Sequence, residues 1–196
     1  VRVLGRGTVS VVYEARDRFL GGTVALKLLR YPDRIPGSVE RFRREIIALR
    51  RVVHRNVIRS FECGEFEGLP WTILERVAGE DIDGLILRRD RELSVARSLH
   101  LAAQAFAGLG AVHAAGILHR DIKPGNLMVG PGDAVLLIDF GLARLPASGS
   151  GLTIPGTVLG SPSYIAPEVL LGLAQHSRAS DIYSLGAVLY EMLTGR

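Results

Sequence analysis

Lysine and asparagine are almost missing from this chain of 196 residues, although it is rich in arginine. It has 22 arginines but only two lysines, Lys27 and Lys123, and only two asparagines, Asn56 and Asn126. Such a bias can come from coding preference alone. Arginine, however, cannot replace the compact ammonium of lysine at a tight phosphate contact. The two lysines therefore mark positions where arginine would not serve, a hypothesis that the surrounding motifs test.

Cysteine, long apolar runs and dense basic runs are scarce as well. Cys63 is the single cysteine, which excludes an internal disulfide and fits a reducing compartment. No apolar stretch approaches the length of a membrane span. The net charge of +4 is modest, and no basic run indicates a nucleic-acid surface. The chain begins at Val1 and stops at "LTGR", so we expect it to be a piece of a longer protein.

The first part of the chain, residues 1–77, predicts a sheet with one long helix. Alternation over 1–17 indicates two strands joined by a glycine turn, and "TVALKLL" indicates a third strand. From Ser38 onward, apolar residues recur at spacings of three and four, which predicts a helix that Ser38 caps. Residues 56–77 return to strand character around a turn near Gly68. The apolar stripe of the helix would be Phe42, Ile46, Leu49 and Val53.

The second part is mainly helical. A long helix is predicted from Ser94 to Gly116 and a last helix from Asp181 to Leu193. Between them, "NLMVGPGDAVLLID" predicts a hairpin of two short strands. The Gly, Ser, Thr and Pro content of 145–162 is typical of a flexible linker. The expected buried stripe of the long helix is Val95, Leu99, Ala102, Phe106, Leu109 and His113.

Two features of the first part favour contact with a phosphate. Gly5 and Gly7 lie between strands, where glycine lets the backbone approach a phosphate, although an ordinary hairpin can have the same glycines. Lys27 lies on the same face of an apolar strand as Ala25, and a buried lysine needs an anionic partner. That partner is a phosphate or Glu45 of the following helix. The alternative is a surface lysine paired with a surface glutamate.

The stretch "HRDIKPGN" at 119–126 is more specific. Asp121 can accept a proton from a hydroxyl, and Lys123 can place positive charge over a group being transferred. Asn126 can offer its side-chain oxygen to a cation, and Asp139, after an apolar strand, can add a charged oxygen. Magnesium prefers such ligands and usually shares them with phosphate. A polar turn before a capped strand end would not need all these residue types at once.

These motifs occur in the order found in protein kinases: Gly5-x-Gly7 with Val12, "VALK" at 24–27, "HRDIKPGN", "DFG" at 139–141 and "APE" at 166–168. Over nearly its whole length the chain resembles the eukaryotic-like serine/threonine protein kinases of bacteria. The resemblance implies an α+β, bilobal fold. Residues 1–77 would form an N-lobe of antiparallel sheet and one helix, ending in the hinge. Residues 78–196 would form a mainly helical C-lobe that is incomplete at its C-terminus.

The resemblance also implies a site for ATP and Mg²⁺ between the lobes. Lys27, paired with Glu45, would contact the α- and β-phosphates. Asp121 would accept the proton of the substrate hydroxyl, and Lys123 would contact the transferred phosphate. Asn126 and Asp139 would hold magnesium. The residues implied to surround the nucleotide are Gly5, Gly7, Ser10, Val12, Ala25, Lys27, Glu75, Val77 and Met128, with Leu74 as gatekeeper.

The implied activity is transfer of the ATP γ-phosphate to a serine or threonine of a protein substrate. Arg120 beside Asp121 suggests regulation by phosphorylation of the activation segment, with Thr153 and Thr157 as candidates; unmodified linker threonines are the alternative. Self-association for trans-autophosphorylation is also expected, as is a cytoplasmic location, either free or as the cytoplasmic part of a membrane-anchored parent. No nucleic-acid partner is expected. The alternatives are a pseudokinase scaffold and an ATP-dependent small-molecule phosphotransferase.

Several positions depart from the family pattern or need a structural test. Ser10 makes the glycine loop less glycine-rich, Ser60 replaces a usual leucine, and Ser161 stands where threonine is commoner. Glu168 usually pairs with an arginine further along the C-lobe. Asp181 would begin a buried helix that anchors the catalytic loop; the alternative is a simple helix cap, and the two roles can hold together.

Overall fold

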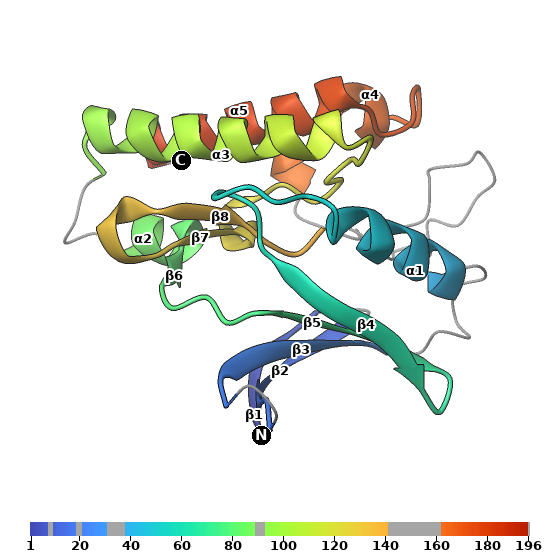
Figure 1. Ribbon diagram of the computed structural model, residues 1–196. Helices are drawn as coiled ribbons and strands as arrows, with labels where there is room; N and C mark the ends of the chain where they lie inside the picture. The colour runs from blue at the N-terminus through green and yellow to red at the C-terminus, as the bar shows by residue number, and fades with distance from the viewer. Residues whose placement is uncertain (8–9, 19–20, 31–37, 89–92, 141–161, 196) are drawn as a thin grey trace.

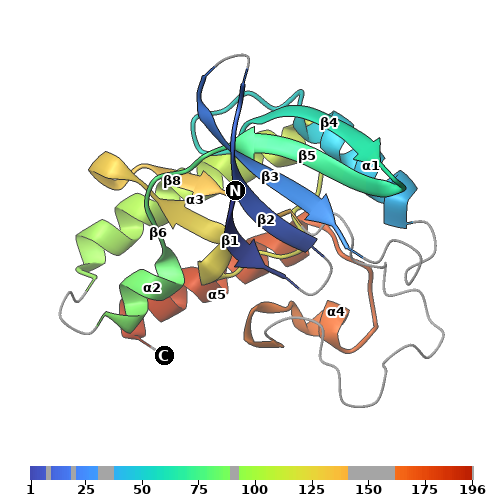
Figure 2. The ribbon, with the colours of Figure 1, turned by 90° about the horizontal axis from the view of Figure 1, so that it is seen from below.

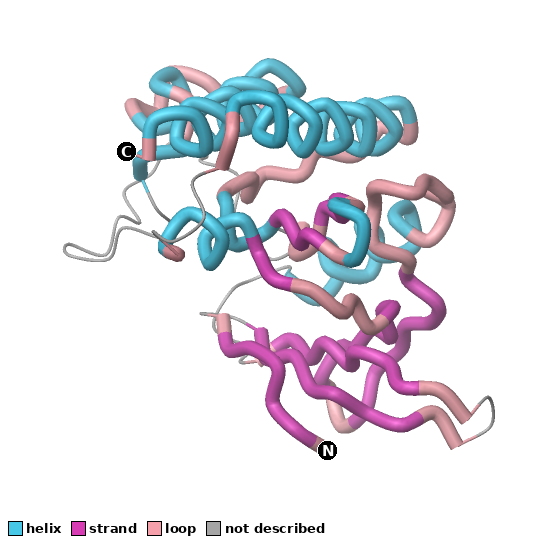
Figure 3. Tube along the Cα trace, turned by 90° about the vertical axis from the view of Figure 1, so that its left-hand side faces the viewer, coloured by secondary structure: helices cyan, strands magenta, loops and turns pink. Residues whose placement is uncertain are grey.

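The chain folds into a layer of β-sheet and a layer of helices that lie one above the other (Figure 1). The computed structural model describes residues 1–7, 10–18, 21–30, 38–88, 93–140 and 162–195. The N-terminus lies in the sheet layer, and the last helix lies in the opposite layer beside the other long helix. Figure 3 shows the same two layers from the side. This α+β arrangement agrees with the prediction.

The first layer is a five-stranded antiparallel sheet in the order β1-β2-β3-β5-β4. Its strands are β1 (Arg2–Arg6), β2 (Ser10–Arg16), β3 (Thr23–Leu29), β4 (Ser60–Phe66) and β5 (Leu69–Glu75). Along β3 the buried residues alternate with less buried ones, so Ala25, Lys27 and Leu29 share one face, as predicted. The predicted turn lies at Glu67 and Gly68, both with positive φ.

The helix α1 (Ser38–Leu49) covers one face of this sheet next to β4 and β5. Phe42, Ile46 and Leu49 are buried there, which confirms most of the predicted stripe. The prediction for Val53 is wrong, because this residue is 84% exposed. The helix has already ended, and the turn in which Val52 N–H donates to Leu49 O buries Val52 instead.

The second layer combines a small sheet with helices (Figure 2). Its strands β6 (Glu80–Asp81), β7 (Leu127–Val129) and β8 (Val135–Leu137) pair in that order. Its helices are α2 (Ile82–Leu87), α3 (Val95–Ala114), α4 (Pro167–Leu170) and α5 (Arg178–Thr194). The antiparallel β7–β8 hairpin is the one predicted, with a 3-10 turn at Pro131–Asp133 between its strands.

The helix α3 begins after Ser94, whose side chain accepts a hydrogen bond from Arg97 N–H, as the predicted start requires. The predicted buried stripe is wrong in part, since Val95 is 62% and Leu99 50% exposed, and Phe106 is also exposed. The buried face carries instead Ser98, Leu101, Ala102, Ala105, Gly108, Leu109, Val112 and His113. Small residues let α3 lie close to β8 and α5, so packing selected that face over the larger apolar side chains.

The helix α5 begins three residues before its predicted start at Asp181. Ser177 is the N-cap, and Ser177 and Ser180 form a reciprocal capping box. Asp181 therefore lies in the first turn of α5 and is not its cap, which overturns the capping alternative. Its carboxylate is therefore available to accept hydrogen bonds from another segment of the chain.

The described residues form two apolar cores, of which the first joins the layers and the second lies within the helical layer. One lies between the five-stranded sheet and α1, and extends to Ile117 and Phe140. The other lies among α2, α3, the β7–β8 hairpin and α5. The division into lobes at residue 77 stays a prediction. None of the helices in the described part of the chain combines the length and apolar character needed to cross a membrane.

Candidate active site

Lys27 and Asp139 form an ion pair that joins the two layers. Lys27 lies mid-strand in β3, opposite Val12 on one side and Thr72 on the other, and is 7% exposed. Its Nζ lies 3.0 Å from Asp139 Oδ1. The ammonium of Lys27 is the main reason why the pKa of Asp139 lies below its ordinary value. The burial of Lys27 beside an anionic group was expected, but the expected partner was a phosphate or Glu45, and the partner that the structure shows is Asp139.

Asp139 lies two residues after β8 and adopts a left-handed backbone conformation, with φ at +53°. The next residue, Phe140, is buried, and its ring lies 4.5 Å from that of His119, centroid to centroid. Ile138 N–H donates to Asn126 O at 3.0 Å, which ties this strand end to the loop before β7. The carboxylate of Asp139 thus sits on a fixed backbone while its side chain stays 40% exposed.

Asp121, Lys123 and Asn126 gather on the loop before β7. The Lys123 Nζ lies 3.3 Å from Asp121 Oδ2. Asn126 is buried, and its Nδ2 donates to Asp121 O at 2.6 Å and to Asp121 Oδ2 at 3.1 Å. The same nitrogen lies 3.5 Å from Asp139 O. These contacts fix the amide group of Asn126 between the two aspartates.

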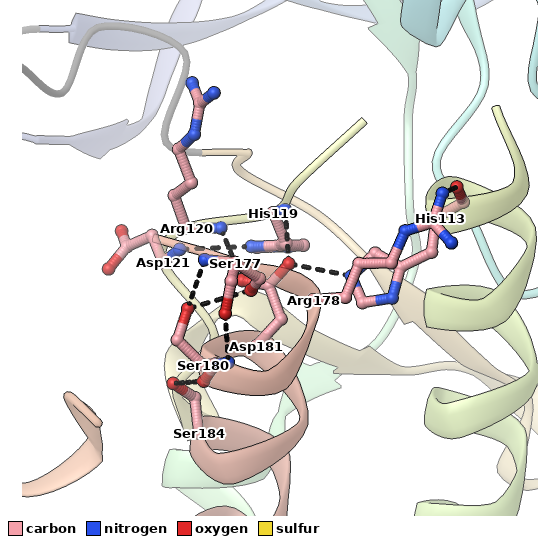
Figure 4. A network of polar contacts seen from close by, with 9 residues as sticks. All are labelled: His113, His119, Arg120, Asp121, Ser177, Arg178, Ser180, Asp181 and Ser184. Carbon is pink, nitrogen blue, oxygen red and sulfur yellow. Dashed lines mark hydrogen bonds and ion pairs between the residues drawn. The ribbon is translucent and has the colours of Figure 1, made fainter. Parts of the chain in front are cut away.

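Asp181 holds the loop that carries Asp121 (Figure 4). Its Oδ2 accepts the His119 N–H and its Oδ1 accepts the Arg120 N–H, both at 2.8 Å. Arg120 has φ at +63°, a conformation that costs roughly 1–3 kcal/mol for a residue with a side chain. A buried carboxylate that accepts both amides stabilises this strained backbone, while the Asp121 carboxylate points away from Asp181.

His119 is fully buried, and burial lowers its pKa, so the imidazole is neutral. Its Nε2 lies 3.0 Å from Ile138 O, and its Nδ1 lies 3.4 Å from Asp121 N. Both contacts are satisfied when Nε2 carries the proton and Nδ1 accepts the Asp121 N–H. His119 thereby links the loop of Asp121 to the strand end of Asp139.

His113 was not predicted as a site residue, because its spacing placed it only on an apolar stripe. Its Nε2 donates to Asp181 Oδ2 at 2.9 Å, and Arg178 donates to His113 O at 2.8 Å. Both contacts appear in Figure 4. The signal that could have found it is chemical, because a histidine that faces the core needs a polar partner.

Comparison with known proteins decides the family. The protein kinase domain model matches residues 1–196, the whole chain. The chain belongs to the protein kinase domain family.

Named relatives are bacterial kinases. A probable serine/threonine-protein kinase of Bifidobacterium longum, pknA2, is 36% identical over 201 residues, which cover 100% of this chain and 26% of the relative. The serine/threonine-protein kinase PknB of Mycobacterium tuberculosis is 38% identical over 98% of this chain and 32% of its own length. The chain thus spans about a quarter to a third of these curated relatives.

A solved structure confirms the fold. The crystal structure of the Mycobacterium tuberculosis PknI kinase domain matches with a TM-score of 0.79 and 28% identity, over 100% of this chain and 72% of that one. The α+β kinase fold inferred from the motifs is therefore confirmed.

The kinase-domain positions predicted to surround a nucleotide lie on several elements. Gly5 lies in β1, and Gly7 N–H donates at 2.9 Å to the backbone oxygen of Ser10, the first residue of β2. Val12, Ala25, Leu74 and Val77 belong to one apolar cluster, and Met128 is a half-buried residue of β7.

The predicted hinge is tied to the sheet. Glu75 N–H donates to Arg59 O, and its Oε1 accepts the Arg59 N–H, each at 2.9 Å. Arg76 Nε donates to Glu14 Oε2 on β2 at 2.9 Å, which is the main reason why the pKa of Glu14 is lowered. Backbone and side-chain contacts thus hold the start of the hinge against β2 and the segment before β4.

Several kinase-domain predictions concern side chains that the structure does not describe. Glu45 lies on α1, but its side chain is outside the described set, so its pairing with Lys27 stays a prediction. Thr153, Thr157 and Ser161 also lie outside the described residues. Ser60 is described: it is buried, and its hydroxyl lies 3.1 Å from that of Thr72. It has therefore found a polar partner in the position where a leucine is usual.

The two residues predicted to hold metal fit magnesium in the kind and number of their donor groups. Asn126 and Asp139 supply one amide and one carboxylate, hard oxygen donors from facing segments. Among the described residues, no group of three or more His, Cys, Asp or Glu side chains could hold a metal ion. A two-residue set suits an ion that shares its remaining ligands with phosphate and water.

Proposed function

We propose that this chain is the catalytic part of a protein kinase that transfers the γ-phosphate of ATP to a serine or threonine hydroxyl of a protein. The observation that carries the proposal is the convergence of Lys27, Asp121 and Asp139, with Asn126 bonded to both aspartates. Phosphoryl transfer depends on positioning and charge neutralisation, and these side chains supply both.

Each residue has a distinct role in this proposal. Lys27 neutralises charge on the nucleotide phosphates, and Asp121 orients the substrate hydroxyl and accepts its proton. Lys123, 3.3 Å from Asp121, places positive charge beside the group in transfer. Asn126 and Asp139 would hold magnesium, which when bound neutralises phosphate charge.

The nucleotide surroundings complete the proposal. Gly5, Gly7 and Ser10 would cover the phosphates with backbone N–H groups. Val12, Ala25, Val77 and Met128 would enclose the adenine, and the backbone of Glu75 and Val77 would meet its polar edge. Glu45 would orient Lys27. The shared apolar cluster of Val12, Ala25 and Val77 supports this assignment.

Partners and location follow from the same reaction. The substrate is a protein with an accessible serine or threonine, and a second copy of the kinase is one such substrate if activation occurs by trans-autophosphorylation. We place the reaction in the cytoplasm, where ATP is available and an unpaired Cys63 stays reduced.

The test is incubation of the purified protein with radiolabelled ATP and Mg²⁺, beside the variant Asp121→Asn. We expect label on serine or threonine in the wild type and a loss of at least about a hundredfold in the variant, since the proton acceptor is gone. Equal label in both proteins would refute the role of Asp121. Binding of Mg–ATP without any transfer would favour a pseudokinase scaffold.

A further inference from the structure

Asn56, one of the two asparagines, has no place in the proposed reaction, yet it is only 3% exposed. It lies in the segment between α1 and β4. Its Nδ2 donates to Val135 O of β8 at 2.7 Å and to Gln104 Oε1 of α3 at 3.1 Å. One amide nitrogen thus satisfies two acceptors from two other elements, which requires its two hydrogens.

The backbone around Asn56 pairs with β8 as well. Leu137 N–H donates to Asn56 O, and Ile58 N–H donates to Leu137 O, each at 3.0 Å. Val57 forms an isolated parallel bridge with Leu137. Since β8 is the last strand of the β6-β7-β8 sheet, the segment of Asn56 covers its outer edge.

The contacts of Asn56 with Val135, Leu137 and Gln104 are called the Asn56 joint below. Gln104 extends this joint to the turn of the β7–β8 hairpin. Its Oε1 also accepts the Val135 N–H at 3.2 Å, and its Nε2 donates to Asp133 O at 2.8 Å. The amide groups of Asn56 and Gln104 therefore bind both backbone groups of Val135. Any shift of β8 along its axis would break several of these bonds together.

The Asn56 joint connects the sheet that carries Lys27 with the strand that precedes Asp139. The segment of Asn56 leads into β4, which pairs with β5, and β5 pairs with β3, the strand of Lys27. On the other side, β8 ends two residues before Asp139. The 3.0 Å contact between Lys27 and Asp139 is a second, direct link between the same two parts of the fold.

We propose that Asn56 is a positioning residue that sets Lys27 against Asp139 for Mg–ATP. This inference rests on the proposed function. Loss of its two hydrogen bonds would let β8 shift relative to the five-stranded sheet. Lys27 and Asp139 would then be misaligned although neither residue is substituted.

The test compares Asn56→Ala with a matched control, Arg97→Ala. Arg97 forms a two-bond ion pair with Asp133 in the turn of the same hairpin, and neither bond involves the segment of Asn56. We expect calorimetry to show Mg–ATP binding weakened roughly tenfold in Asn56→Ala and less than about twofold in Arg97→Ala. Unchanged binding in Asn56→Ala overturns the inference.

A double-mutant cycle separates positioning from general loosening of the fold. In a Lys27→Met background, Asn56→Ala should weaken Mg–ATP binding by less than about twofold, because no ammonium remains to be misplaced. An equal loss in both backgrounds overturns the inference. If Asn56→Ala does not fold, Gln104→Met enters the same cycle, since it removes the acceptor for Asn56 and keeps the side-chain length.

The cycle measures binding of Mg–ATP, whereas the proposed function is tested by phosphate transfer, so the two can fail separately. Wild-type protein that binds Mg–ATP but labels no serine or threonine would refute the kinase proposal. The double-mutant cycle would still test the positioning role of Asn56, because it measures binding alone. An active wild type, together with an equal effect of Asn56→Ala on Mg–ATP binding in both backgrounds, would refute this inference alone.

Discussion

At the scale of single residues, the site depends on charged groups that the protein partly shields from water. Lys27 is nearly buried, so its ammonium needs the carboxylate of Asp139. Both would turn to the phosphates and the metal when Mg–ATP binds in the proposed site. The ion pair thus keeps two charged groups solvated by each other in the protein alone.

Substitution of Lys27 should change the titration of Asp139. In Lys27→Met, we expect the pKa of Asp139 to rise, because the Lys27 charge is the largest cause of its lowering. The stabilisation from this pair is fully present above the unfolded aspartate pKa of about 3.9, and is lost as pH falls through the lower folded value. NMR titration of side-chain carboxyl carbons measures the change.

Asp133 is the internal control for that titration. Its pKa is lowered mainly by Arg97 and not by Lys27, so it should titrate alike in both proteins. An Asp139 pKa that stays at its wild-type value in Lys27→Met would contradict the ion pair.

At the scale of elements, close approach of α3 to β8 is what lets the Asn56 joint form. Gly108 faces that contact: a Cβ there would lie 2.6 Å from Asn56 O and 2.6 Å from Leu137 Cδ1. Such distances require backbone or core atoms to move. The glycine is therefore needed for packing and not for helix geometry.

Two glycines of α3 provide a matched pair. Gly108→Ala should lower the free energy of unfolding by about 1–3 kcal/mol through overpacking. Gly110→Ala, with nothing within 4 Å of its Cβ, should leave it unchanged or raise it by up to about 1 kcal/mol through helix propensity. Urea unfolding of both variants measures the difference, and equal effects would refute the close contact.

Local patterns in the sequence predicted most elements because alternation and capping act within a few residues. The strand of Lys27, the start of α3 at Ser94 and the β7–β8 hairpin were predicted in this way. The buried face of α3 was predicted only in part: Ala102, Leu109 and His113 are buried as expected, but packing placed small residues such as Gly108 on the rest of that face. Motif order suggested the candidate site residues, but not the partners that their side chains contact.

The missed contacts join residues far apart in the chain. Asn56 and Val135 are 79 positions apart, and His113 and Asp181 are 68. No spacing rule connects such pairs, because the partner depends on how whole elements pack. Scarcity of asparagine was a hint for Asn56, although composition could not say what it binds.

At the scale of the whole molecule, the proposed nucleotide site takes its charges from both layers. Lys27 comes from the five-stranded sheet, whereas Asn126 and Asp139 flank the strands of the β7–β8 hairpin. A ligand bound by both layers stabilises the folded chain over the unfolded one. The effect should depend on the metal, because Asn126 and Asp139 would reach the phosphates through it.

Thermal unfolding with ATP, with and without Mg²⁺, tests this dependence. At a hundredfold excess over Kd, ligand binding stabilises by about 2.7 kcal/mol, which for this length raises Tm by roughly 5–10 °C. Asp139→Asn should lose the part of the shift that needs Mg²⁺ and keep the part due to ATP alone, since Lys27 remains. Asp133→Asn, in the same hairpin but paired with Arg97, should keep both parts. A full magnesium-dependent shift in Asp139→Asn would mean that the metal is held elsewhere, because the amide that replaces the carboxylate has no charge with which to neutralise a cation.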